Sequence, residues 1–279
     1  VSPGGGRVAG LDILPSLAAI RDEVDYVIAS VPARSALKLI DECVEKRVRF
    51  IQYCTAGFSE TGDPQGESIE RQMRERARRG GLRIIGPNCI GSFCPAAGLQ
   101  LGPTPLGRTG APGAVSFISQ SGGIAAKLVE YGIARQIRFC KGISVGNCID
   151  LDTSDFLDYF ADDEETRVVG AYLEGTRDGR QLFHSLCRVG HSKPTIVWKG
   201  GRTEAGAAAA RSHTGSLASS APVWSAMLHQ AGAIEARMYL IEPDLADWHD
   251  MVERVLLALS LPGDHVPVLV HNYRRLWTP

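Results

Sequence analysis

Short runs of β-branched and aromatic residues recur along the chain, with helical patterns between them. Seven such runs predict strands at 24–31, 48–54, 82–86, 114–119, 137–145, 167–174 and 193–200. Alternation of strand and helix is typical of βαβ units, in which helices cover both faces of a parallel sheet. The pattern therefore predicts an α/β protein built on parallel sheets.

The starts of two helices can be read from the residues. The segment 32–47 opens on Pro32, which suits the first turn of a helix because its missing N–H has no partner there. In the segment 153–163, Thr153 and Ser154 are placed to cap the first turn. A later helix is expected at 245–260, followed by the apolar run 266–271.

The stretch 95–114 separates two groups of βα units and holds four of the fifteen prolines and five glycines. Such a stretch predicts a domain boundary. We expect a first domain at 1–107, a second at 108–260, and a C-terminal extension or incomplete third unit at 261–279. Only three strands are predicted before Pro95, so the first βα unit of a complete nucleotide-type domain is expected to be missing.

Composition narrows the class of protein. Apolar residues make up 44% of the 279 residues, charged residues 22%, and the formal net charge is −1, as in soluble globular proteins. The most basic stretch, 71–79, lies on a helical pattern and is interpreted as a solvated helix face, so no nucleic-acid partner is implied. The sequence has neither a run of about 18 apolar residues nor a signal segment, which disfavours membrane insertion and secretion.

The cysteines also restrict the chemistry. There are seven of them, an odd number, and they form no CxxC pair. Neither a disulfide framework nor a zinc site is indicated, and a reducing cytoplasm fits best.

Two turns that follow predicted strands are candidate anion sites. In "SQSGGIAAK" (119–127), backbone amides and the Ser121 hydroxyl could surround an anion, which Gly122 and Gly123 would let approach closely. The alternative is a tight turn whose serine only caps the helix. The second candidate is "IGPNCIGSF" (85–93), where a plain loop is the alternative and Cys89 is expected to be a packed thiol rather than a nucleophile.

Two residues are candidates for catalysis. Glu174 lies at the carboxyl end of a predicted strand, where the catalytic groups of parallel sheets are found. His213, in "RSHTG", precedes a helix expected from about Leu217. Neutral imidazole can accept a phosphoryl group, and a carboxylate such as Glu174 would fix which ring nitrogen is free. Taken singly, Glu174 is better interpreted as a structural carboxylate and His213 as a loop histidine.

The ordered set "VSPGGG", "SVPA", "GPNC", "SQSGG", "YLEG" and "SHTG" resembles the α subunit of succinyl-CoA synthetase. It is more similar still to the α part of NDP-forming acetyl-CoA or acyl-CoA synthetases, over residues 1–236. The resemblance implies a Rossmann-like CoA-binding domain followed by a flavodoxin-like ligase domain. It also suggests an N-terminal truncation, because the family's opening strand and glycine-rich turn are absent.

The resemblance assigns roles to individual residues. His213 corresponds to the phosphorylated histidine and Glu174 to the glutamate that holds it. The implied phosphate-binding residues form two helix starts that face each other, at Ser121, Gly122 and Gly123 and at Asn88, Cys89 and Ile90. The implied CoA-binding residues are Ser2, Pro3, Val31, Pro32, Thr55, Ala56, Gly57 and Phe58.

The family reaction converts acyl-CoA and phosphate, through an acyl phosphate, into free acid and phosphohistidine, whose phosphoryl group passes to ADP or GDP. The resemblance therefore implies coenzyme A as cofactor, acyl-CoA and phosphate as substrates, and an oligomer with an ATP-grasp β subunit or fused domain that holds the magnesium nucleotide. The alternative hypothesis is a non-catalytic, truncated protein that binds CoA or acyl-CoA. A nicotinamide dehydrogenase is disfavoured because GxGxxG is missing.

Overall fold

The computed structural model describes residues 1–100, 112–201 and 220–236. Within it the chain divides into two units: a first made of 1–89 with 147–151, and a second made of 90–146 and the described residues from 152 onward. Several predicted features lie outside the described residues. They are the domain boundary between 107 and 108, the helix 245–260, the apolar run 266–271 and the segment 261–279. All seven predicted strands are present.

The first unit is built on a parallel sheet with the order β3-β4-β5. Helices α1 and α2 pack against each other, and side chains such as Ile40, Ile51 and Met73 are fully buried in its core. A short antiparallel hairpin, β1-β2, precedes the sheet. The elements are β1 (Arg7–Val8), β2 (Leu11–Asp12), β3 (Tyr26–Ala29), α1 (Ala36–Glu45), β4 (Phe50–Tyr53), α2 (Pro64–Gly80) and β5 (Arg83–Ile85), with short 3-10 turns at Leu17–Ala19, Ala33–Ser35 and Ser59–Thr61.

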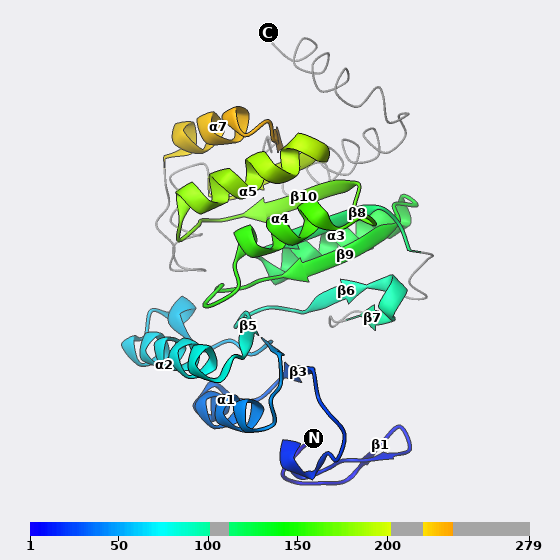
Figure 1. Ribbon diagram of the computed structural model, residues 1–279, viewed down its shortest axis with the longest axis vertical. Helices are drawn as coiled ribbons and strands as arrows, with labels where there is room; N and C mark the ends of the chain where they lie inside the picture. Colours follow the sequence, from blue (N-terminus) through cyan, green and yellow to red (C-terminus); the bar gives the residue numbers. More distant parts are fainter. Residues whose placement is uncertain (101–111, 202–219, 237–279) are drawn as a thin grey trace. The chain divides into compact units, whose positions relative to one another are not determined.

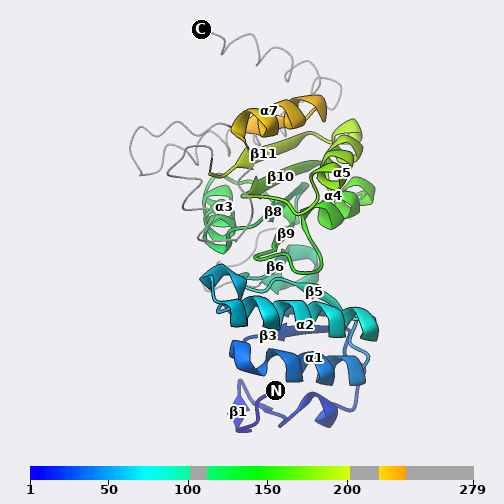
Figure 2. The same cartoon turned by 90° about the vertical axis from the view of Figure 1, so that its left-hand side faces the viewer.

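The second unit is built on a seven-stranded sheet with the order β12-β11-β10-β8-β9-β6-β7. Strands β12 to β9 in this order are parallel, and β6 and β7 extend the sheet in antiparallel fashion. Helix α3 covers one face of the parallel part, and α4 and α5 cover the other (Figure 2). The elements are β6 (Ser92–Cys94), β7 (Leu99–Gln100), β8 (Val115–Ser119), α3 (Gly122–Ala134), β9 (Phe139–Ser144), α4 (Thr153–Asp162), β10 (Val168–Leu173), α5 (Gly179–Ser192), β11 (Thr195–Lys199), α7 (Ala221–Gln230) and β12 (Ile234–Ala236), and a 3-10 turn spans Pro95–Ala97.

The order of the parallel strands is that of a flavodoxin-like domain. Strand β8 comes first in the chain and lies between β9 and β10 (Figure 1). Strands β11 and β12 follow beyond β10. In such sheets the direction of winding reverses between the first strand and the third, and ligands bind beyond the carboxyl ends of the strands at that point. The predicted flavodoxin-like fold is confirmed, and the site is expected between β8 and β10.

The first predicted helix begins four residues later than expected, and the second begins at Thr153 as predicted but has a different cap. Pro32 has an extended ψ of 148° and precedes a 3-10 turn, so α1 begins only at Ala36. In α4 the cap is Asp152, whose carboxylate accepts from the Ser154 N–H at 2.8 Å while the Asp155 carboxylate accepts from the Asp152 N–H. This reciprocal capping box places Thr153 and Ser154 inside the first turn, because the carboxylate one residue earlier already satisfies the free amides.

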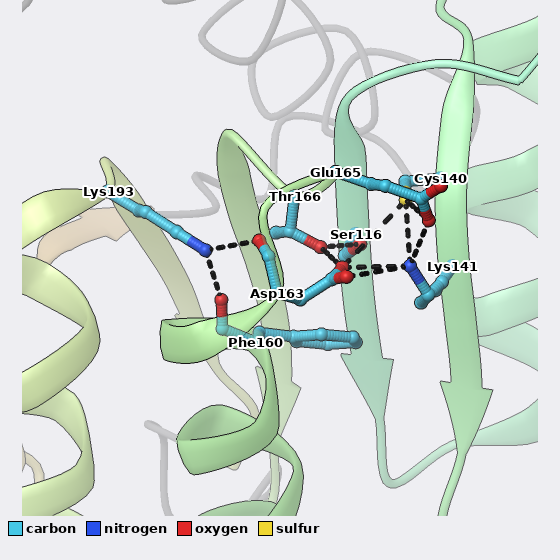
Figure 3. A network of polar contacts seen from close by, with 8 residues as sticks. All are labelled: Ser116, Cys140, Lys141, Phe160, Asp163, Glu165, Thr166 and Lys193. Carbon is cyan, nitrogen blue, oxygen red and sulfur yellow. Dashed lines mark hydrogen bonds and ion pairs between the residues drawn. The ribbon is translucent and has the colours of Figure 1, made fainter.

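A polar network closes the amino-end edge of the second sheet, near the starts of β8 and β9 (Figure 3). The Lys141 ammonium lies 2.9 Å from the Asp163 carboxylate and 2.6 Å from that of Glu165. Thr166 bonds to Asp163 and to Ser116. The ligand atoms of Cys140, Asp163 and Glu165 are close enough to hold a metal ion. Lys141 already supplies the positive charge there, so we interpret the network as structural.

Replacing Lys141 by methionine is expected to lower the free energy of unfolding by about 2 kcal/mol near neutral pH, less than for a fully buried pair because Glu165 is exposed. Burial acts to raise the pKa of Asp163, but hydrogen bonds from Lys141 and Thr166 hold it below its ordinary value of 3.8. A depressed carboxyl pKa stabilises the fold above the unfolded pKa, and the contribution is lost as pH falls through the folded pKa.

Urea denaturation between about pH 3 and 7 measures this contribution. The difference in unfolding free energy between wild type and Lys141→Met should become smaller below about pH 4. The control is Lys127→Met, which removes an exposed pair with Glu130 and should change stability by less than about 0.5 kcal/mol. Equal stability of wild type and Lys141→Met at every pH would contradict the assignment.

Candidate functional site

The residues that follow β8 and β10 meet at the carboxyl edge of the second sheet. Tyr172 of β10 is paired with Ser119 of β8, so the next residues of both strands lie side by side. The Gln120 Oε1 atom accepts hydrogen bonds from the backbone N–H groups of Glu174 and Gly175, and its Nε2 atom donates to the Gly175 carbonyl at 2.8 Å. This side chain therefore joins the two loops at the point where the strand order reverses.

Glu174 is a buried carboxylate at this edge, with only 5% of its surface exposed. The Tyr172 hydroxyl is hydrogen-bonded to its side chain, and burial followed by the charge of Glu174 raises the pKa of Tyr172. The ammonium of Lys199, at the end of β11, donates to the Glu174 backbone carbonyl at 2.9 Å. The predicted position of Glu174 at the end of a strand is confirmed.

Helix α3 starts beside these groups. The Ser121 hydroxyl accepts from the Ile124 N–H at 3.4 Å, so it caps the helix as the plainer interpretation expected. The amides of Gly122 and Gly123 belong to the first turn, where N–H groups have no carbonyl partner inside the helix. The two glycines differ: a Cβ atom at Gly122 would lie 2.5 Å from Ile90 Cγ2, whereas one at Gly123 would meet no described atom within 4 Å. Of the two, Gly123 is the position open to a ligand.

Asn88, Cys89 and Ile90 do not start a helix, so that part of the prediction is wrong. They form a turn that leads into β6, because the backbone next pairs with β9: the Ile90 N–H donates to Ser144 Oγ and the Ser144 N–H donates to the Gly91 carbonyl. Asn88 and Cys89 belong to the first unit and Ile90 to the second.

Cys89 is a packed thiol, as expected. It is buried, its Sγ atom donates to the Tyr53 carbonyl at 3.4 Å, and a hydrogen bond with Cys54 and burial raise its pKa. The Asn88 N–H donates to the Thr55 carbonyl at 3.0 Å, and its side-chain amide donates to Asn147 Oδ1. Asn88 therefore lies beside the Thr55 loop of the first unit.

The predicted CoA positions gather partly at the carboxyl edge of the first sheet. Val31 and Pro32 follow β3, and Thr55, Ala56 and Gly57 follow β4, with a Gly57 Cβ position 3.7 Å from Ala33 Cβ.

The other three predicted CoA positions differ in exposure. Phe58 is fully buried and packs edge-on against Tyr53, so its side chain belongs to the core and cannot contact a ligand. Ser2 and Pro3 are exposed before the β1-β2 hairpin, where the Ser2 N–H donates to the Leu14 carbonyl.

Comparison with known proteins also divides the chain into two parts. Residues 1–95 match the family model for a CoA binding domain, and residues 112–240 match that for the succinyl-CoA ligase like flavodoxin domain. Two α subunits of ADP-forming acetate–CoA ligases from Pyrococcus furiosus are similar along most of the chain: the form I subunit is 39% identical over 93% of it, and the form II subunit is 40% identical over 82%. The chain therefore carries two family domains, a CoA binding domain and a succinyl-CoA ligase like flavodoxin domain.

A solved protein of similar sequence has the same fold. The dinucleotide-forming acetyl-coenzyme A synthetase 1 of Ca. Korarchaeum cryptofilum, in complex with phosphate and ADP, superposes with a TM-score of 0.79 at 38% identity over 85% of this chain. The chain spans about half the length of these relatives: 54% and 50% of the two Pyrococcus subunits and 51% of the Korarchaeum chain.

The predicted histidine motif at His213 lies outside the described residues, which end at Gly201 and resume at Ser220. Both ends of that gap are close to the candidate site. Gly201 follows β11, which ends in Lys199, and Trp224 of α7 lies with its ring centroid 5.1 Å from the Lys199 ammonium. The helix start expected at about Leu217 also lies outside the described residues, and α7 is described from Ala221.

Gln120 and Lys199 were not predicted from the sequence, although Gln120 directly follows β8, Lys199 ends β11, and both polar side chains are buried. Glu60 was not predicted either; its carboxylate accepts from the amides of Gly57 and Phe58 and from Asn147. Burial acts to raise the pKa of Glu60, but these hydrogen bonds hold it below its ordinary value. Nothing in the sequence links Glu60 to Asn147, 87 residues away.

Within residues 1–100, 112–201 and 220–236, no helix has the length and apolar character needed to cross a bilayer.

Proposed function

We propose that this chain is the α part of an NDP-forming acyl-CoA synthetase, which interconverts acyl-CoA, phosphate and NDP with acid, CoA and NTP. The observation that carries the proposal is the buried Glu174 beside the start of α3, in a chain 39% identical to an acetate–CoA ligase α subunit. A buried carboxylate next to free helix amides suits the transfer of a phosphoryl group to a histidine.

In this proposal His213 is the nucleophile. One imidazole nitrogen attacks the phosphorus of an acyl phosphate, a P–N bond forms, and the P–O bond to the acyl oxygen breaks, so the acid leaves as its carboxylate. Glu174 accepts a hydrogen bond from the other ring N–H, which keeps the attacking nitrogen unprotonated and offsets the positive charge that develops on the ring. The amides of Gly122 and Gly123 stabilise the phosphoryl oxygens, as helix N-termini do for anions.

The first unit would hold coenzyme A, whose thiol carries the acyl group that passes to phosphate in the family reaction. Its match to a CoA binding domain supports this assignment, as do the loops after β3 and β4, where Ala56 and Gly57 are exposed. Val31, Pro32 and Thr55 would contribute beside them, with Ser2 and Pro3 from the N-terminal loop. Phe58 would contribute only its backbone.

We also propose that an ATP-grasp β subunit or fused domain completes the cycle and supplies the magnesium nucleotide. The α-subunit names of the relatives support a partner of this kind. The seven free cysteines are in keeping with a reducing cytoplasm.

The test is to incubate the chain with a compatible β subunit, magnesium and γ-labelled ATP, and to map the label. We expect label on His213 and none after His213→Ala, while His191→Ala, which changes an exposed histidine at the end of α5, should be labelled like wild type. Equal labelling of His213→Ala would show that the histidine is wrongly assigned. CoA binding by calorimetry with no label in wild type would favour the non-catalytic hypothesis.

A further inference from the structure

We propose that Gln120 and Lys199 form a clamp on the main chain at Glu174 and Gly175, and that both are positioning residues for the Glu174 carboxylate. The role rests on the proposed function; the clamp itself is a feature of the second unit. Neither residue would contact the transferred phosphoryl group in this proposal.

Glu174 needs such a clamp because it lies past the end of the sheet ladder. Leu173 is the last residue of β10 that pairs with β11, opposite Lys199. Beyond that pair, backbone direction must be set by other groups, since no neighbouring strand fixes it. The φ and ψ angles of Glu174 determine where its carboxylate points, so whatever holds its two peptide groups also aims the side chain.

Gln120 holds three of the four polar backbone groups of Glu174 and Gly175. Its Oε1 atom accepts from both N–H groups, and its Nε2 atom donates to the Gly175 carbonyl. Gln120 itself is fixed, because its own N–H donates to the Tyr172 carbonyl at 3.1 Å and only 8% of its surface is exposed. A single amide side chain thus matches the pattern of donors and acceptors of the turn.

Lys199 holds the fourth group, the Glu174 carbonyl, at 2.9 Å, and also donates to the Gly200 carbonyl. It is 3% exposed, and burying an ammonium group is costly unless it is bonded. The ring of Trp224, in α7, covers the ammonium, and its centroid lies 5.1 Å from Lys199 Nζ, a favourable cation–π distance. The buried cation therefore connects β10, β11 and the first turns of α7, the helix that follows the His213 segment.

The test is a double-mutant cycle on the rate at which label reaches His213 in the complex with the β subunit. Gln120→Met and Lys199→Met should each slow the transfer about tenfold or more when Glu174 is present, because small misplacements of a catalytic group are costly. In a Glu174→Gln background the same changes should have less than about a twofold effect, since there is no carboxylate left to aim. Equal slowing in both backgrounds would overturn the positioning role.

Two further variants separate positioning from general damage. Gln120→Glu keeps the acceptor for both N–H groups but loses the donor to Gly175, so its rate should lie between wild type and Gln120→Met. Gln181→Met, an exposed glutamine on α5, should behave like wild type. A Gln120→Glu rate as low as that of Gln120→Met, with both proteins folded, would contradict the assigned bonds.

Amide hydrogen exchange tests whether Gln120 holds the main chain at Glu174 and Gly175, even if no label is transferred. Gln120→Met should lose protection at the Glu174 and Gly175 amides while the Ala171 amide inside β10 stays protected. If wild type takes no label but this pattern holds, the proposed function fails and the clamp stands. Unchanged protection at Glu174 and Gly175 would overturn the clamp whatever the activity.

Discussion

Replacing Glu174 by glutamine is expected to slow phosphorylation of His213 by about 100-fold or more, within the range by which positioned proton-transfer groups accelerate reactions. Glutamine has nearly the same shape, and the main-chain bonds from Gln120 and Lys199 do not involve the carboxylate. The substitution therefore removes the negative charge without removing what holds the residue. The carboxylate that would keep one imidazole nitrogen free and stabilise the charged ring is lost.

Rapid-quench measurement of label on His213 tests this expectation, together with a thermal unfolding curve for the variant. Glu130→Gln is the matched control, because Glu130 is an exposed carboxylate on α3 paired only with Lys127 among the ion pairs of the described residues. It should label at the wild-type rate. A Glu174→Gln variant with an unchanged rate would show that Glu174 is a structural carboxylate.

Replacing Gly66 by alanine is expected to cost about 2 to 3 kcal/mol of unfolding free energy, as overpacking at a rigid contact does. Gly66 lies in the first turn of α2, and a Cβ atom there would be 2.4 Å from the Phe58 carbonyl oxygen and 2.6 Å from its carbon. Both are backbone atoms, so no side-chain rotation relieves the clash. The loop from Thr55 to Phe58 must move, and CoA binding should weaken with it.

Chemical denaturation and calorimetric titration with CoA measure the two effects. The control is Gly179→Ala, also in the first turn of a helix, where a new Cβ atom would meet no described atom within 4 Å. Its stability should stay within about 1 kcal/mol of wild type or rise slightly, because alanine is the better helix former. Wild-type stability and CoA affinity in Gly66→Ala would show that the loop is not held by this contact.

Elements whose signal is local were predicted well. The strands from β3 to β11 in the parallel parts of both sheets were found because each is a short apolar run, and such runs arise from burial on both faces. Helix ends were less well predicted: α1 begins at Ala36 rather than at Pro32, and the cap of α4 is Asp152 rather than Thr153 or Ser154. Strands β6 and β7 were missed because they are short and lie beside or within the stretch rich in glycine and proline.

Within the candidate site too, features with a local sequence signal were predicted and features set by distant contacts were not. "YLEG" and "SQSGG" could be recognised because a polar residue directly after a strand, or glycines at a helix start, are visible within a few residues. Asn88 and Ile90 look like one motif in the sequence, yet Asn88 lies against Thr55 in the first unit and Ile90 against Gly122 in the second. The chain passes from one unit to the other between them.

By itself, the sequence determined the fold class, the strands of the parallel sheets and the motifs that mark the family, because apolar periodicity and turn chemistry depend on neighbours along the chain. Only the tertiary structure decided which residues surround Glu174. Gln120 is 54 residues from it and Lys199 is 25 residues away, and they meet it because β8 and β11 flank β10 with their carboxyl ends at one edge. Contacts of this kind are set by strand order and register, which no short stretch of sequence encodes.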